Sequence, residues 1–130
     1  MSEMKLTEAQ HQFLVQYLGL LNEVESTIQF VGECYLQGDA DIGDRLLKDI
    51  MTSLAPFNRD NMTVYSIFGS DDLALKTLDK FQASVDISIN VEERFSRIWD
   101  RATFLNDTLA PSLQSWRQII KKYLEIKQAD

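Results

Sequence analysis

The 130-residue sequence contains only one cysteine, one histidine, two prolines and five glycines. A single cysteine excludes a disulfide framework, and five scattered glycines cannot build a glycine-rich phosphate loop. Hydrophobic residues make up 45 % of the chain, which excludes a disordered protein. The length fits one domain over residues 1–130, which can bury a core without help from a metal or a disulfide.

Long apolar runs are also missing. The most apolar window, 13–21, is interrupted by Gln16 and Gly19, whereas a membrane-spanning helix needs about 20 apolar residues. The first five residues lack the basic start and apolar core of a signal peptide. We therefore expect a cytoplasmic protein with no membrane partner, in which Cys34 is reduced.

Positive charge is scarce, because 13 basic side chains face 20 acidic ones and leave a formal net charge of −7. No lysine or arginine occurs from Leu6 to Asp44. Since an acidic chain is repelled by phosphate backbones, we expect no nucleic-acid partner. The acidic stretch has two interpretations: basic residues near the C-terminus neutralise it within the fold, or it forms a docking face for a basic partner.

Helical periodicity dominates what is present. Apolar residues of the first segment recur at alternating spacings of three and four, typical of one buried helix face: Leu14, Tyr17, Leu21, Val24, Ile28, Val31 and Tyr35. Thr7 and Gln10 stand in the register of a capping box, and Gly38 predicts the end of the helix. We expect this helix over about 7–37.

Three further helices are expected over about 41–68, 71–88 and 91–127. Because proline lacks a backbone N–H, Pro56 and Pro111 are expected to bend the first and last of them. The chain is thus predicted to be all-α, an antiparallel up-down four-helix bundle with kinks near Pro56 and Pro111.

The segment 85–91 is the ambiguous one, because it alternates apolar and polar residues as a strand does. No other segment alternates in this way, so a strand here would have no partner. We favour a helix end followed by a new helix start, with Asn90 as its cap and Glu93 at the third position.

Metal-binding patterns are incomplete. A di-iron carboxylate site in a helical bundle needs two Glu-x-x-His motifs, and Glu8 with His11 supplies only one. A calcium loop counted from Asp39 would need a glutamate at its twelfth position, which holds Ile50. We therefore expect no metal and interpret the acidic turn as a helix cap.

Catalytic parts are missing as well. His11 is the only imidazole that could activate a serine or cysteine, and it lies near the N-terminus. Cys34 lies at helical spacing from Val31 and is expected to be a core thiol. We predict a protein that is not an enzyme, with no catalytic residues, no cofactor-binding residues and no cofactor.

Large apolar residues occur outside the predicted helix seam. Phe30 and Leu36 fall on the outer side of the first helix, and Trp99 and Phe104 lie beside the seam of the last. Contiguous exposed apolar residues mark binding surfaces. The candidate interaction surface combines two of these residues, Phe30 and Leu36, with three carboxylates of the acidic helix: Glu23, Glu25 and Glu33.

Two segments carry a resemblance to other proteins: Gly38-Asp39 followed by Gly43–Ile50, and Leu105–Trp116 with its proline, leucine and tryptophan spacing. They resemble an uncharacterised group of small, acidic, all-helical cytoplasmic proteins of Gram-positive bacteria. The resemblance implies a helical bundle and a cytoplasmic location, and brings no activity or site residues. In size, acidity and helicity the chain is also similar to flagellar export chaperones, an analogy of architecture alone.

Taken together, these features predict a non-catalytic protein–protein interaction module, adaptor-like or chaperone-like. Its expected partner is another protein, with a second copy of the chain (a homodimer) as one option. The alternative is an acidic inhibitor or immunity protein that masks a basic surface on its partner.

Overall fold

In the computed structural model, which describes residues 5–126, every regular element is helical, so the all-α prediction is confirmed. The helices are α1 (Glu8–Leu36), α2 (Ala40–Leu54), α3 (Met62–Phe68), α4 (Asp72–Ile89), α5 (Val91–Arg94), α6 (Ile98–Phe104) and α7 (Ala110–Leu124), with a π-helical turn, η1 (Leu105–Leu109), between the last two.

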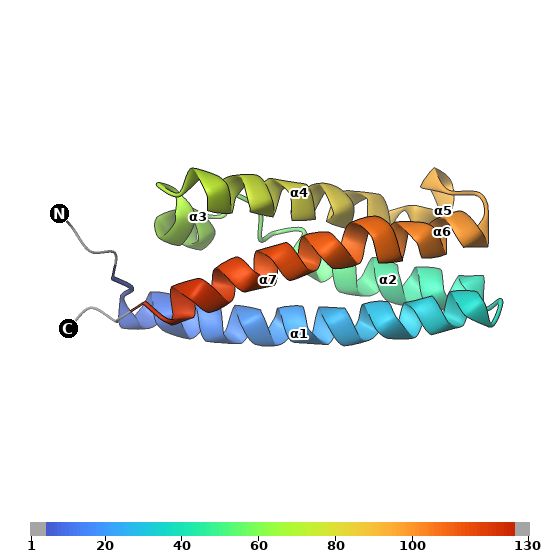
Figure 1. Ribbon diagram of the computed structural model, residues 1–130, viewed down its shortest axis with the longest axis horizontal. Helices are drawn as coiled ribbons and strands as arrows, with labels where there is room; N and C mark the ends of the chain where they lie inside the picture. Colours follow the sequence, from blue (N-terminus) through green and yellow to red (C-terminus); the bar gives the residue numbers. More distant parts are fainter. Residues whose placement is uncertain (1–4, 127–130) are drawn as a thin grey trace.

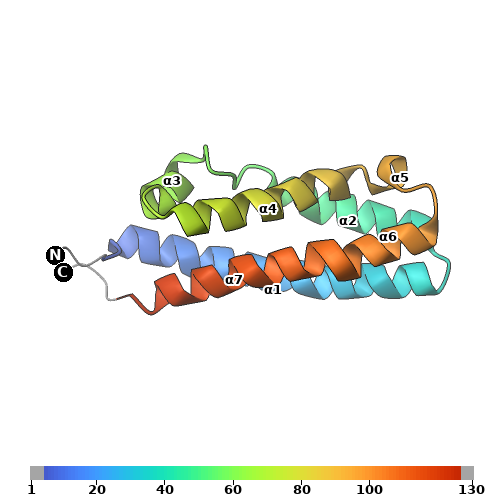
Figure 2. The same cartoon turned by 45° about the horizontal axis from the view of Figure 1, so that its top comes forward.

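The long helices run side by side along an elongated molecule (Figure 1). α1 packs against α2 and α7, and α4 packs against the other sides of α2 and α7. Figure 2 shows the same neighbours after rotation, with α3 at one end and α5 at the other. The two ends of the described chain lie together at the α3 end, whereas the α1–α2 turn and the α5–α6 turn lie at the opposite end, called here the α1–α2 end.

α1 forms as its sequence predicts. The Thr7 hydroxyl accepts from the Gln10 N–H while the Gln10 side chain accepts from the Thr7 N–H, which completes the capping box. Gly38 adopts a φ of 84°, a left-handed conformation that glycine tolerates and that turns the chain into α2. The seven seam residues are all buried, together with Cys34.

The continuous bent helix expected over 41–68 is instead two helices. α2 ends at Leu54, and residues 55–61 form an irregular turn before α3. Pro56 cannot extend the helical ladder, and the Gln82 side chain of α4 donates to the Leu54 and Phe57 carbonyls at 3.3 and 3.0 Å. These carbonyls therefore find partners outside a helix. Asn61 then caps α3 by accepting from the Val64 N–H.

The ambiguous segment 85–91 is helical up to Ile89, and a new helix starts after Asn90. Val85 and Ser88 are buried, at the three-residue spacing of a helix face rather than the two-residue spacing of a strand. Asn90 stands at the expected boundary, but its side chain makes no capping hydrogen bond.

The last predicted helix, 91–127, is also interrupted. α5 is a single turn, residues 95–97 are extended or bent, and α6 begins at Ile98. Helix α7 ends at Leu124, and residue 127, the predicted end, lies outside the described residues. At Pro111 the chain remains helical, and the π-helical turn η1 precedes this proline. In η1 the Ala110 N–H donates to the Leu105 carbonyl, five residues earlier, which gives a wider turn than an α-helix has.

The core is continuous along the molecule and rich in aromatic contacts. Trp116 is fully buried, and its indole N–H donates to the Tyr17 hydroxyl at 2.8 Å. Phe68 packs against both Trp116 and Tyr123, with ring centroids 5.0 and 4.6 Å apart. These contacts join α1, α3 and α7 at the end where the described chain begins and ends.

Substituting a leucine by alanine tests this division between core and surface. Leu47→Ala removes a fully buried side chain and should lower the free energy of unfolding by about 2–5 kcal/mol. Leu73→Ala, at a position that is 70 % exposed, should change it by less than about 0.5 kcal/mol. Urea unfolding followed by circular dichroism measures both, and equal losses would contradict the packing.

A second prediction concerns Asp71, the N-cap of α4. The Tyr123 hydroxyl donates to its carboxylate at 2.6 Å, and this hydrogen bond together with that from the Ala74 N–H lowers the pKa of Asp71. A lowered folded-state pKa contributes stability above about pH 4, the ordinary aspartate pKa, and this is lost as the pH falls through the lowered pKa.

Tyr123→Phe should therefore cost about 2 kcal/mol of unfolding free energy near neutral pH, because it removes one hydrogen bond to a carboxylate. The difference from the unmodified protein should shrink as the pH falls below about 4. Urea unfolding at a series of pH values measures it, and a difference that stays constant into strong acid would rule out this linkage.

Candidate interaction surface

An apolar hollow of about 220 Å³ opens at the α1–α2 end, between the last turn of α1 and the first turns of α6. Its walls are formed by Tyr35, Leu36, Gly38, Ile98, Trp99 and Ala102. Leu36 is 74 % exposed and Trp99 is 70 % exposed, so two of the largest exposed apolar side chains of the described chain line the same hollow. This hollow, with those six residues, is called the end hollow below.

Local structure explains why these two side chains face outward. Leu36 is the last residue of α1, and the turn at Gly38 leads the chain away before another element can cover it. Trp99 lies in the first turn of α6, just after the irregular segment 95–97. In contrast, Phe104 is buried and its ring packs on Phe95 at a centroid distance of 5.4 Å.

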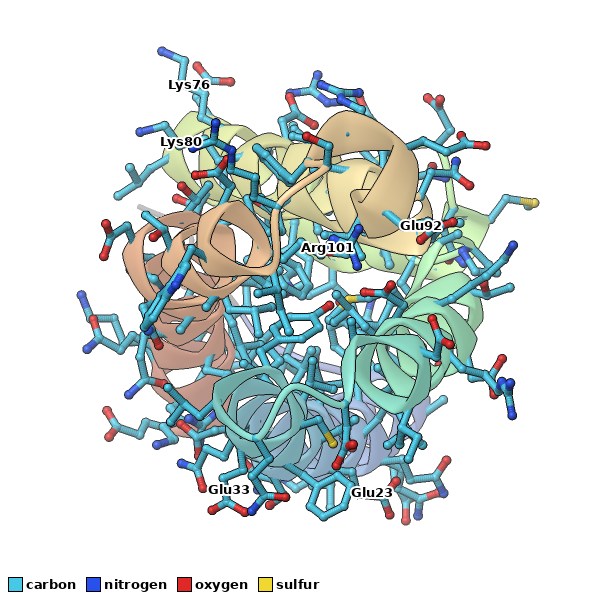
Figure 3. The ribbon with its side chains drawn as sticks, turned by 90° about the vertical axis from the view of Figure 1, so that its right-hand side faces the viewer. Glu23, Glu33, Lys76, Lys80, Glu92 and Arg101 are labelled. Atoms are coloured by element: carbon cyan, nitrogen blue, oxygen red, sulfur yellow. The ribbon has the colours of Figure 1, made fainter. Side chains whose placement is uncertain are left out.

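A polar network lies behind the end hollow and fixes its walls. Arg101 Nη1 lies 2.7 Å from Asp44 Oδ2, and the Tyr35 hydroxyl donates to Asp44 Oδ1 at 2.7 Å. Arg101 Nε donates to the Phe95 carbonyl at 2.8 Å. Burial, followed by the hydrogen bond to Asp44, raises the pKa of Tyr35. The network therefore links α1, α2 and α6, and in the end-on view of Figure 3 the Arg101 side chain points inward between the helices.

The charged residues close in sequence to the walls of the end hollow are mostly acidic. Five exposed charged residues lie within three positions of a wall residue, and none is held in an ion pair within residues 5–126: Glu33, Asp39, Asp41, Asp100 and Arg97. Four of the five are carboxylates. Burial raises the pKa of the Cys34 thiol, and the nearby carboxylates of Asp39 and Glu33 raise it further.

The five residues of the candidate interaction surface predicted from the sequence differ in their exposure and contacts. Phe30 is 52 % exposed and lies outside the core, as Leu36 does. Glu23 and Glu33 are exposed and point away from the molecule (Figure 3). Glu25 is different, because Arg117 of α7 donates to its carboxylate at 2.8 Å. Glu25 is therefore partly neutralised within the fold and is not a free surface charge.

Trp99 is the residue that sequence reasoning did not place at the surface site. Its position beside the helical seam was visible, but the pairing with Leu36 depends on the break at 95–97, which no sequence pattern predicted. Within α6, Trp99 is exposed and Phe104 is buried, although the two aromatics had similar positions in the predicted helix.

A second hollow, of about 330 Å³, lies between α4 and the η1–α7 run and is lined mostly by polar residues. Its walls are formed by Thr77, Lys80, Ser84, Asp107, Thr108, Pro111, Ser112 and Ser115. The Ser84 and Ser112 hydroxyls donate to the carbonyls of their own helical segments. None of its wall residues is a large exposed apolar side chain, so the end hollow is the stronger candidate for a protein-binding surface.

Residues 5–126 contain no group of three or more histidine, cysteine, aspartate or glutamate side chains arranged to hold a metal ion. His11 lies in the first turns of α1, and Cys34 is buried near its end. Within the same described range, no helix combines the length and the hydropathy needed to cross a membrane.

These features define a small all-helical domain with an apolar hollow at one end. Residues 12–119 match a family described as a domain of unknown function (DUF8042), and the chain belongs to this family. Comparisons with curated proteins and with solved structures give no match for the chain.

Removing the charge at position 101 tests the network behind the end hollow. The Arg101 and Asp44 side chains are 12 % and 13 % exposed, so Arg101→Met leaves a nearly buried carboxylate without its cation. We expect a loss of about 3 kcal/mol in the free energy of unfolding.

Arg59→Met is the matched control, because the Arg59 and Asp79 side chains are 44 % and 50 % exposed and the pair contributes less than about 1 kcal/mol. Chemical unfolding at neutral pH compares the two variants. Equal losses would show that the buried pair does not fix this end of the molecule.

Proposed function

We propose that this protein is a non-catalytic protein–protein interaction module, adaptor-like or chaperone-like, that binds another protein at the end hollow. The observation that carries the proposal is the exposure of Leu36 and Trp99 in the walls of one hollow. Side chains of this size and apolarity favour burial at an interface, and tryptophan is enriched among the residues that dominate binding energy.

The proposal also includes the finer architecture and location expected from the sequence. The long helices are taken as an antiparallel up-down four-helix bundle, with α6, η1 and α7 acting as its fourth helix. The rigid packing of such a bundle would present the end hollow in a preformed state, which lowers the entropic cost of binding. The protein would act in the cytoplasm, without a metal or another cofactor.

Site-specific photo-crosslinking tests the proposal in the cells that make the protein. A benzophenone amino acid replaces Gln37, an exposed residue beside Leu36. We expect a discrete crosslinked product whose yield falls at least about tenfold when Leu36→Ser and Trp99→Ser are added, because both anchors are lost.

The matched control carries Met62→Ser and Leu73→Ser, which remove two apolar side chains on α3 and α4 that are 86 % and 70 % exposed. The control should crosslink as the original protein does. A product that survives the loss of Leu36 and Trp99 would reject the end hollow as the binding surface. A product between two copies of the chain would identify the homodimer.

The second candidate is an inhibitor or immunity protein that masks a basic surface, and the outward-facing carboxylates of α1 favour it. Glu23 and Glu33 are exposed on this helix, which carries no lysine or arginine (Figure 3). For a partner bound there, Glu23→Gln with Glu33→Gln should weaken binding several-fold and reduce its salt dependence. Titration calorimetry at two salt concentrations measures both effects, and unchanged affinity would reject this candidate.

A further inference from the structure

We propose that the end hollow accepts one large apolar side chain from a basic amphipathic helix of the partner protein, and that lysines or arginines of this helix contact the carboxylates around the hollow. The inference rests on the proposed function, because it names the chemistry of the partner at the same surface.

The size and lining of the hollow favour a side chain rather than a free small molecule. Its volume of about 220 Å³ lies below the range of about 300–1,000 Å³ that is usual for small-molecule sites. Leu36 and Trp99 provide apolar walls, and the Tyr35 hydroxyl is already donated to Asp44. The hollow thus offers contact area and little directional polarity, which suits an apolar anchor residue.

The charges around the hollow define the rest of the partner. Four exposed carboxylates and a single exposed guanidinium, Arg97, lie within three sequence positions of a wall residue, and Arg101 is already held by Asp44. The end of α1 adds the negative pole of a 29-residue helix, whose last turn contains no basic residue. The electrostatic field therefore favours a cationic partner.

The same charges disfavour a second copy of the chain, since two identical ends would bring the same excess of carboxylates together. The described ends of the chain lie at the opposite end of the molecule from the hollow (Figure 1). An amphipathic helix places an apolar anchor and basic residues on neighbouring positions, at spacings of three and four residues.

Two synthetic helical peptides test the inference. Each has about 18 residues with leucine on one face, and the other face carries either lysine or glutamate. Both lack tryptophan, so the emission reports on the protein, where Trp99 is exposed and Trp116 is buried. We expect the lysine peptide to shift the Trp99 emission to shorter wavelength and to bind at least about tenfold more tightly than the glutamate peptide, with affinity falling as salt rises.

Matched variants distinguish peptide binding at the end hollow from nonspecific electrostatic attraction between a basic peptide and an acidic protein. Asp39→Asn with Asp100→Asn should weaken binding of the lysine peptide several-fold, as should Trp99→Ser when binding is measured by calorimetry. Asp49→Asn with Asp86→Asn removes the same charge from exposed positions on α2 and α4 and should leave the affinity unchanged.

Equal binding of the two peptides, or equal effects of the two pairs of aspartate substitutions, would overturn the inference. If crosslinking at Gln37 still depended on Leu36 and Trp99, the proposed function would stand and only the partner chemistry would fall. Sedimentation of the protein alone tests whether a second copy of the chain occupies the end hollow. A dimer that disappears with Trp99→Ser would also overturn the inference.

Discussion

The ion pair between Asp44 and Arg101 is the interaction on which the candidate surface depends. Both side chains are nearly buried, so each charge needs a partner to offset the loss of water. Tyr35 and the Phe95 carbonyl supply the remaining hydrogen bonds. Because these four residues come from α1, α2, α6 and the segment before α6, satisfying the pair fixes where α6 begins relative to the end of α1.

Apolar burial and polar contacts have different roles in this fold. The apolar stripes of the long helices supply most of the buried area, but such stripes can pack in several registers. Specific polar contacts select one of them: Trp116 donates to Tyr17 between α7 and α1, and Arg117 contacts Glu25 between the same two helices. The end hollow is a consequence of this selected register, because its walls come from α1 and α6.

Sequence reasoning succeeded where the determinants are local. The seam of α1, its capping box and its glycine-terminated end all depend on residues within a few positions of one another. It failed at 55–61 and 95–97, because those breaks are stabilised by contacts from elsewhere: Gln82 on the Leu54 and Phe57 carbonyls, and Arg101 on the Phe95 carbonyl.

The candidate surface, too, could be predicted from the sequence only where its determinants lie within one helix. The exposure of Phe30 and Leu36 followed from the helical pattern, since both lie outside the seam of one helix. The ion pair that occupies Glu25 involves a residue far along the chain, as does the placement of Trp99 beside Leu36. No periodicity within a single helix contains that information.

The most direct test of the account is ¹⁹F NMR of the protein labelled with fluorotryptophan, recorded in H₂O and in D₂O. We expect two resonances, of which only that of Trp99 changes with the solvent isotope, because Trp99 is 70 % exposed and Trp116 is fully buried. In a variant carrying Arg101→Met, the Trp99 resonance should broaden as α6 loses its anchor. A Trp99 resonance that is insensitive to solvent would show that the end hollow is closed, and would contradict the account.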